Sequence, residues 1–552
     1  MAQTSLWRRC VRYIHFARFL QPSQFFWRLW NIIWQPIPNL RPPPLRDQSS
    51  GYWLAPGRRV QGLVNSNRFR FLNVERELRF PGAWNDMSFG RRWLYDLHSF
   101  HYLNARGWEK GHAWHQPLIR RWIDDNRPAA GIGWHPYLIS LRIVNWIKWA
   151  LAGNELPAEA KHSLAVQTRF LSTRLERELM ANHLLANGKG LVFAGLFFEG
   201  VEAEGWLRRG LRILHREFEE QVLDDGGHFE RSPMYHSIVL EDCLDLWNLL
   251  RFHGRESLFA WHDHLHRMRS WLRAMCHPDG QVALFNDTAL NIAASPGEIE
   301  SYARRLGLTP TNAPGSGILH LRDSGFVRMA KGPCVAIVDV APLGPDYQVS
   351  HGHADNLTFE LSLSGERVVV DTGISRYDRS PERLQQRETA AHNTVVVDSH
   401  NSSDVWGGFK VGKRAKTVDV SVAAEGKRLR LQAAHDGYRR FAGVGHHRRS
   451  WDMSDGELII TDTVEGHGRH AVEVIFHFHP RICLIERDPH VFLLMTGQDE
   501  RLAAVHMDHR LKSDARWTSY HPEFGLDLPN RELVGRWIGE LPVRFETKLA
   551  WA

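Results

Sequence analysis

The chain has 552 residues, of which 43% are hydrophobic and 24% charged, a balance typical of folded proteins that argues against a disordered chain. This length exceeds what one hydrophobic core usually supports, so we expect two to four domains. The formal charge of +7 favours an acidic partner, and the candidates are a polyanionic glycan, a nucleic acid and a membrane surface. No dense run of Lys and Arg occurs, which argues against nucleic acid. The five scattered cysteines form no C-x-x-C, which argues against a disulfide framework and a cysteine zinc finger.

Residues 1–50 form a basic and aromatic arm. Arg8, Arg9, Arg12 and Arg18 interrupt any apolar core of a cleaved secretion signal, so we favour a cytoplasmic location, with a periplasmic one as the alternative. No window of 18 uninterrupted apolar residues occurs, so we expect no transmembrane helix. The arm is expected to lie on a membrane or on the chain's own domain, and we favour the latter.

The period of the apolar residues changes near residue 315. Before it, apolar residues recur at helical spacing, as in 137–151 and 239–252, which predicts helices paired by short loops. After 314–317, runs such as 358–363 and 471–479 alternate or are β-branched. The sequence therefore predicts a multidomain α+β chain, with a domain of helical hairpins (a bundle, solenoid or toroid) at 51–312 and an antiparallel β-sandwich at 313–552.

Two polar clusters occur in the helical half. Asn182 and His183 are adjacent and lie at a helix junction. Downstream, a glycine loop opens into a helix for which Ser232 is a plausible N-cap and Pro233 fits the first position. Tyr235 then lies in the first turn, where the positive end of the helix favours a phenolate.

The sandwich half carries His351-Gly-His353, followed by Asp371 in Val-Asp-Thr-Gly and His392 in Ala-His-Asn-Thr. Two histidines two apart on an extended segment point to opposite faces, so they are expected to do different work. Asp371 and His392 are expected to join one of the histidines around a divalent ion, since two imidazoles and a carboxylate suit zinc. The other histidine is then free to touch a substrate. The alternative is a hydrogen-bonded polar cluster that joins strands.

With these motifs in place, residues 60–480 resemble the heparinase II/III-like polysaccharide lyases, whose relatives include oligoalginate lyases. The resemblance implies an N-terminal incomplete (α/α) toroid followed by a C-terminal antiparallel β-sandwich. It also implies a catalytic group in which Asn182 and His183 neutralise the substrate carboxylate, Tyr235 is the acid/base and His351 completes the site.

The same resemblance implies one divalent metal, with zinc favoured, held by His353, Asp371 and His392. It places Arg376 and Tyr377 where relatives touch the sugar. Glu230, in the loop before Tyr235, is assigned to substrate binding with them.

β-Elimination of a uronate requires such groups. The C5 proton is α to a carboxylate, so stabilising the charge that builds there by Asn182 and protonated His183 lowers the barrier. Tyr235 or His351 takes the proton, and Tyr235 or a water returns one to the departing O4. For Tyr235 to act as a base, its pKa must be lowered, and we expect cationic neighbours such as His183 to lower it.

Two other functions stay open. His351-Gly-His353-Ala-Asp355 satisfies the metallo-hydrolase H-x-H-x-D signature, although Asn356 follows where that signature normally has His. A non-catalytic glycan-binding protein that assists polysaccharide assembly or export is the third function. The favoured partner is an acidic polysaccharide in either the lyase or the binding function.

Overall fold

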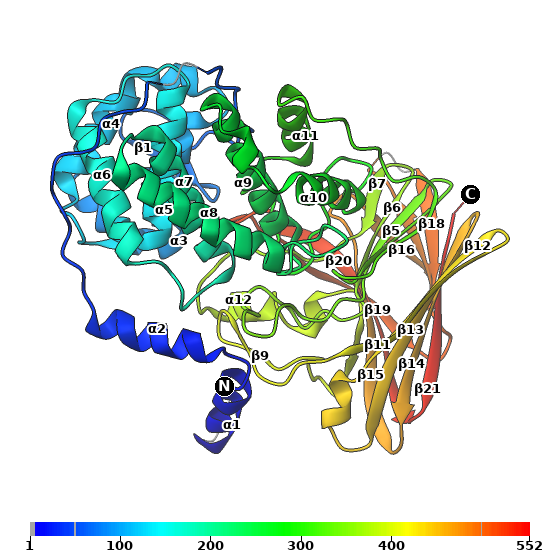
Figure 1. Cartoon of the computed structure of the whole chain (residues 1–552). Helices are drawn as coiled ribbons and strands as arrows, with labels where there is room; N and C mark the ends of the chain where they lie inside the picture. The colour runs from blue at the N-terminus through cyan, green and yellow to red at the C-terminus, as the bar shows by residue number, and fades with distance from the viewer. Residues whose placement is uncertain (1–5, 49–50, 498–499, 552) are drawn as a thin grey trace.

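The computed structural model describes residues 6–48, 51–497 and 500–551. The N-terminal part is helical and the C-terminal part consists of antiparallel strands, and Figure 1 shows the two parts side by side. The last long helix, α11, ends at Arg305 and the first strand of the sandwich, β3, begins at Gly317. The change of element type therefore lies where the apolar period changes, because each period matches one backbone geometry.

The helical part is an incomplete (α/α) toroid of hairpins. Among the described residues it has nine helices: α3 (Arg91–Ser99), α4 (His112–Asp125), α5 (Pro136–Leu151), α6 (Ala158–Thr173), α7 (Ala181–Phe197), α8 (Val201–Gln221), α9 (Pro233–Phe252), α10 (His262–Ala274) and α11 (Pro296–Arg305). Helix α7 is buried along almost its whole length and packs against α8. Glycines permit this approach, since a Cβ at Gly195 would lie 2.6 Å from the backbone nitrogen of Leu207.

One short element of this part was not predicted. A hairpin of β1 (Arg68–Phe71) and β2 (Val74–Glu77) lies beside α3, with the Phe71 ring 5.0 Å from that of Trp93. Four-residue strands are too short to show a reliable period in the sequence.

The C-terminal part is a two-layer antiparallel sandwich. An eight-stranded sheet, in the order β11-β12-β13-β14-β21-β18-β17-β16, packs on a five-stranded sheet β3-β4-β5-β6-β7 and a four-stranded sheet β19-β20-β15-β8. Phe359 joins the layers, since its ring contacts both Trp451 and Phe476. The strands are β3 (Gly317–Leu321), β4 (Phe326–Lys331), β5 (Cys334–Asp339), β6 (Phe359–Leu363), β7 (Glu366–Val369), β8 (Val395–Val397), β11 (Thr417–Glu425), β12 (Arg428–His435), β13 (Val444–Ser454), β14 (Glu457–Gly466), β15 (Arg469–His477), β16 (Cys483–Asp488), β17 (Val491–Met495), β18 (Arg501–His506), β19 (Lys512–Tyr520), β20 (Leu528–Glu540) and β21 (Val543–Ala550).

A long connection between β7 and β8 and the segment after β8 face the toroid. The first carries a short helix, α12 (Pro381–Gln385), and the second carries the two-residue strands β9 (Val405–Trp406) and β10 (Lys410–Val411).

The N-terminal arm forms helices α1 (Leu6–Ala17) and α2 (Pro22–Ile33), drawn in dark blue in Figure 1, and Arg174 of the helical body donates to the Trp34 carbonyl at the end of α2. Arg12 pairs with Asp404 at 2.7 Å, so the arm contacts the chain's own sandwich domain. Among the described residues, we find no helix with the length and apolar character needed to cross a bilayer.

Candidate active site between the two domains

A cleft of about 460 Å³ lies between the toroid and the sandwich. Its walls come from α3, α5, α7 and α9 on the toroid side, and from residues 348, 350, 351, 377 and 409 on the sandwich side. Five residues that the sequence singled out line it together: Asn182, His183, Tyr235, His351 and Tyr377. These residues are up to 195 positions apart along the chain, so the fold brings them together.

Helix α9 presents Tyr235 to this cleft. The Ser232 hydroxyl accepts a hydrogen bond from the Tyr235 backbone nitrogen at 3.3 Å, and Pro233 occupies the first turn. The predicted N-cap is therefore confirmed. The Tyr235 ring contacts the His351 ring, with centroids 4.1 Å apart, which joins a residue of each domain.

The protonation state of Tyr235 differs from the expectation. Burial raises the pKa of Tyr235 well above its ordinary value, and the nearby charge of Arg92 only partly opposes this effect. The predicted lowering of this pKa is wrong, because desolvation of a phenolate outweighs the helix terminus and the neighbouring cations. Tyr235 is thus a neutral hydroxyl that can donate a proton.

Asn182 is held from behind by Glu230. The Asn182 side-chain nitrogen donates to both Glu230 carboxylate oxygens, at 3.0 and 3.1 Å. Glu230 is only 1% exposed and does not line the cleft. The structure therefore corrects the assignment of Glu230 to sugar contact, since its carboxylate orients Asn182 and faces His351 at 3.4 Å.

His183 is paired with a buried carboxylate that the sequence did not reveal. Its Nδ1 lies 3.0 Å from Glu176 Oε1, and its ring packs on Tyr137 with centroids 4.5 Å apart. Burial opposes a charge on His183, but the charge and hydrogen bond of Glu176 outweigh burial and raise the pKa of His183. A protonated ring beside Asn182 suits a bound carboxylate.

His351 and His353 share one carboxylate. Asp287 accepts from His351 Nδ1 at 2.8 Å through one oxygen, and lies 2.9 Å from His353 Nε2 through the other. Arg383 pairs with the same carboxylate, and this charge, working against burial, holds the pKa of Asp287 well below its usual range. His351 Nε2, the other ring nitrogen, lies 3.4 Å from Glu230 Oε2, and His351 lines the cleft, whereas His353 is fully buried and does not. The different work expected of the two histidines stays a prediction.

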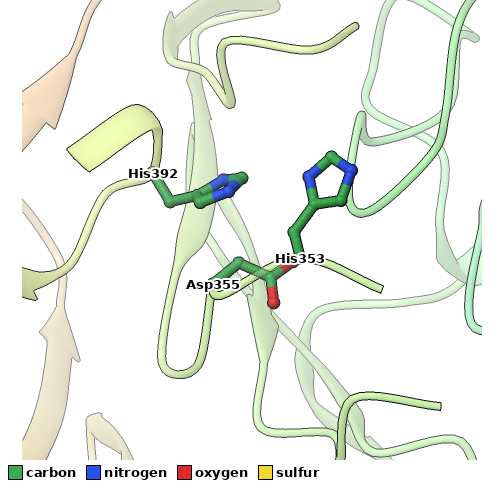
Figure 2. Close-up of side chains that lie close together, drawn as sticks. All are labelled: His353, Asp355 and His392. Carbon is green, nitrogen blue, oxygen red and sulfur yellow. The ribbon is translucent and has the colours of Figure 1, made fainter. Parts of the chain in front are cut away.

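Figure 2 shows a second cluster, in which His353, Asp355 and His392 point toward one another. Their ligand atoms all lie within 4.8 Å of one another. His353 Nδ1, Asp355 Oδ2 and His392 Nε2 are buried, and none of these atoms has a hydrogen-bond partner. Unpartnered buried polar atoms are costly, so three of them that converge fit a divalent cation.

The electrostatics of this cluster also fit a cation. Burial lowers the pKa of His353 to about 3, which keeps the imidazole neutral as a ligand must be. Burial, together with neighbouring carboxylates, raises the pKa of Asp355 to about 6 and that of Asp339 well above its ordinary value. A positive ion would relieve this crowding of buried acids.

The structure changes one member of the expected ligand set. Asp371 Oδ2 lies 2.7 Å from His392 Nδ1, so it orients that ring, and Asp355 stands third beside His353 and His392. Asp287 does the same for His353, which gives each histidine a carboxylate on its far nitrogen. The sequence could not show which of Asp355 and Asp371 is the ligand, because both carboxylates are close to the histidines along the chain.

The position of the cluster bears on the hydrolase function. His353, Asp355 and His392 are all buried, and none of them lines either cavity described in this section. An ion held by these residues would not line the cleft in which the other site residues meet, which argues against a metallo-hydrolase.

A second cavity of about 880 Å³ shares Arg91, Arg92 and Tyr377 with the cleft as lining residues. Arg76, Arg91 and Arg92 contribute from the toroid side. Arg376 lines this second cavity and not the first, and it is exposed and paired with Asp378 at 2.6 Å. Arg91 and Arg92 therefore place positive charge on the walls of both cavities.

Arg92, Glu176 and Asp287 are the residues that sequence reasoning missed, and Asp355 was recognised only as part of the H-x-H-x-D signature. The local sequences of Arg92, Glu176 and Asp287 carry no signal of their own. Asn286, next to Asp287, has a φ of 55°. A left-handed asparagine marks a constrained turn but is visible only in the structure.

Family models match most of the chain. The Heparinase II/III N-terminus model matches residues 85–305, and the model of Heparinase II/III-like, C-terminal, matches residues 313–551. The chain belongs to the heparinase II/III-like family.

Curated relatives of this family match only in part. A heparin-sulfate lyase of Bacteroides stercoris is 28% identical over 315 residues, which cover 53% of this chain and 45% of the relative. FtsZ-localized protein C of Caulobacter vibrioides is 26% identical over 396 residues, 65% of each chain. The chain thus aligns with about half to two thirds of these relatives' length.

Solved structures agree on the fold. A crystal structure of heparinase III matches with a TM-score of 0.67 at 18% identity, covering 85% of this chain and 77% of the other. At this identity the likeness supports the toroid-plus-sandwich fold alone.

Proposed function

We propose that the protein is a polysaccharide lyase that cleaves a uronic-acid-containing glycan by β-elimination. The observation that carries the proposal is the convergence of Asn182, His183, Tyr235 and His351, from two domains, on one cleft. The heparin-sulfate lyase relative supports the same reaction class.

The substrate carboxylate lies against Asn182 and protonated His183. The amide of Asn182 is held by Glu230 and the ring of His183 by Glu176, so both donors are oriented before the substrate binds. Positive charge at this place stabilises the negative charge that develops on the carboxylate when C5 loses its proton.

His351 is the base. Because its Nδ1 donates to Asp287, the lone pair is on Nε2, which takes the proton from C5. The imidazolium that forms is flanked by the carboxylates of Asp287 and Glu230, at 2.8 and 3.4 Å. The geometry is that of a base oriented and then stabilised by a buried carboxylate.

Tyr235 is the acid. As the C5–H electrons form the C4=C5 double bond, the C4–O4 bond breaks and O4 takes the phenolic proton of Tyr235. The raised pKa of this residue keeps that proton available at neutral pH. Ring contact with His351 lets the resulting phenolate recover a proton, directly or through water, so no outside reactant is consumed.

We propose that His353, Asp355 and His392 would hold one divalent metal ion, with zinc as the favoured metal. When bound it supplies rigidity, since it fixes the His353 ring whose other nitrogen contacts Asp287. Asp287 in turn holds His351, so the ion acts on the site through positioning.

The test is incubation of the purified chain with a panel of uronic-acid polymers. A lyase yields an unsaturated product that absorbs in the near ultraviolet. New reducing ends without this absorbance would select a hydrolase, and saturable binding without any product would select the glycan-binding function.

A further inference from the structure

The N-terminal arm accounts for the whole net positive charge of the chain. The chain has 69 Lys and Arg and 62 Asp and Glu, and residues 1–46 hold seven arginines and no acidic residue. Residues 47–552 therefore carry 62 basic and 62 acidic side chains. The basic balance of the protein is a property of the arm and not of the catalytic domains.

Helix α2 of this arm exposes its apolar side. Its apolar and aromatic side chains face solvent, and they are Phe25, Phe26, Leu29, Trp30, Ile32 and Ile33. Gln24 on the opposite side is only 1% exposed, whereas Ile33 is 71% exposed. An amphipathic helix that covers a core buries the apolar side, so the orientation of α2 is the reverse of the usual one.

Polar contacts hold α2 in this orientation. The Gln24 side chain donates to the Glu178 carbonyl at 3.3 Å, and Arg174 donates to the Trp34 carbonyl at 2.7 Å. The Arg177 guanidinium lies 4.5 Å from the centre of the Trp27 ring. The toroid thus binds the polar side of the helix and leaves the other side free.

The exposed face is continuous and rich in aromatic rings. The Phe26 and Trp30 rings stack with centroids 6.1 Å apart, and Trp30 and Trp34 with centroids 6.0 Å apart. Of the 22 large hydrophobic side chains exposed among the described residues, 13 lie between Tyr13 and Tyr52. The apolar surface of the protein is therefore concentrated where its net positive charge is.

We propose that the arm, and α2 above all, lies in the interface of a membrane whose surface is rich in anionic lipids. Tryptophan and phenylalanine suit the boundary between headgroups and acyl chains, and arginines near it are attracted by anionic headgroups. A polar partner would not need the aromatic face, and an uncharged apolar partner would not need the arginines. A second copy of the chain would bring together two arms that both carry net positive charge.

The experiment is sedimentation of the full-length protein with vesicles. Vesicles of phosphatidylglycerol and phosphatidylcholine are compared with vesicles of phosphatidylcholine alone, at low and high salt. We expect binding to the anionic vesicles that salt weakens, and much weaker binding to the neutral ones.

Three variants separate the contributions. Trp30→Glu should lower the partition coefficient by about tenfold or more, because it removes a large apolar side chain from the interface. Arg28→Gln should lower it about fivefold on anionic vesicles and leave binding to neutral vesicles unchanged. Trp517→Glu is the matched control, since Trp517 lies on β19 and is 70% exposed but far from the arm in sequence, and it should bind as the wild type does.

All three positions are exposed or lie on the exposed arm, so the melting temperature should not change. The proposal is overturned if the wild type does not sediment with anionic vesicles, or if Trp517→Glu weakens binding as much as Trp30→Glu. A wild-type dimer that Trp30→Glu converts to a monomer, without vesicle binding, would assign the face to a second copy instead.

Discussion

Replacing Tyr235 by phenylalanine removes the proposed acid and leaves the ring that contacts His351 at 4.1 Å. Loss of general acid help typically costs about 10²–10⁴ in rate, which corresponds to about 3–5.5 kcal/mol of barrier. Since burial keeps the Tyr235 phenol neutral, the wild type has its full acid at neutral pH, and we expect a loss in the upper half of that range. The loss should appear in kcat, because the hydroxyl acts on the departing O4.

The assay follows the absorbance of the unsaturated product on a good substrate. Tyr137→Phe is the matched control, since Tyr137 lines the same cleft and its ring packs on His183. It should keep turnover within a few-fold of the wild type. Both variants should melt within about 2 °C of the wild type, since each keeps its ring packing. Near wild-type turnover of Tyr235→Phe would refute the assignment and leave His351 to act as both base and acid.

Three further outcomes follow from the site. Because Glu176 raises the pKa of His183, kcat/KM should fall as pH rises through that pKa. In a pH–rate profile, Glu176→Gln should move this alkaline fall in kcat/KM to lower pH. Elemental analysis should find about one equivalent of metal in the wild type. The Asp355→Asn variant should lose the metal, whereas Asp371→Asn should weaken metal affinity by about 10–100-fold. If Asp371→Asn loses the metal and Asp355→Asn only weakens its binding, Asp371 is the ligand. Arg92→Gln should raise KM or lower kcat on an anionic substrate while Arg92→Lys retains most activity, and an unchanged Arg92→Gln would exclude this residue from the site.

Local chemistry explains what could be read from the sequence. The change of apolar period at 314–317 is repeated over many residues, so the helical and sandwich parts were predictable. The Ser232 cap rests on contacts within one turn, which are encoded by neighbouring residues. The hairpin at 68–77 was missed because its strands are only four residues long.

The proposed catalytic set came from motifs together with a family resemblance, and the structure places Asn182, Tyr235 and His351 at one cleft. Asp287 could not be recognised in this way. It contacts His351 and His353, which are 64 and 66 positions further along the chain, and nothing near it in sequence reports that approach.

Charge states and the choice between similar ligands also depended on the tertiary structure. The pKa of Tyr235 was expected to fall because only its helix terminus and cations were considered, whereas desolvation by the packed cleft dominates. Asp355 and Asp371 are both carboxylates near the histidines, and only the fold turns one toward His392 Nδ1 and the other toward the unpartnered nitrogens. The sequence by itself determined the elements, the caps and the kinds of side chain available. The tertiary structure decided which of them meet, and how far each is removed from water, because those quantities depend on contacts between residues that are distant along the chain.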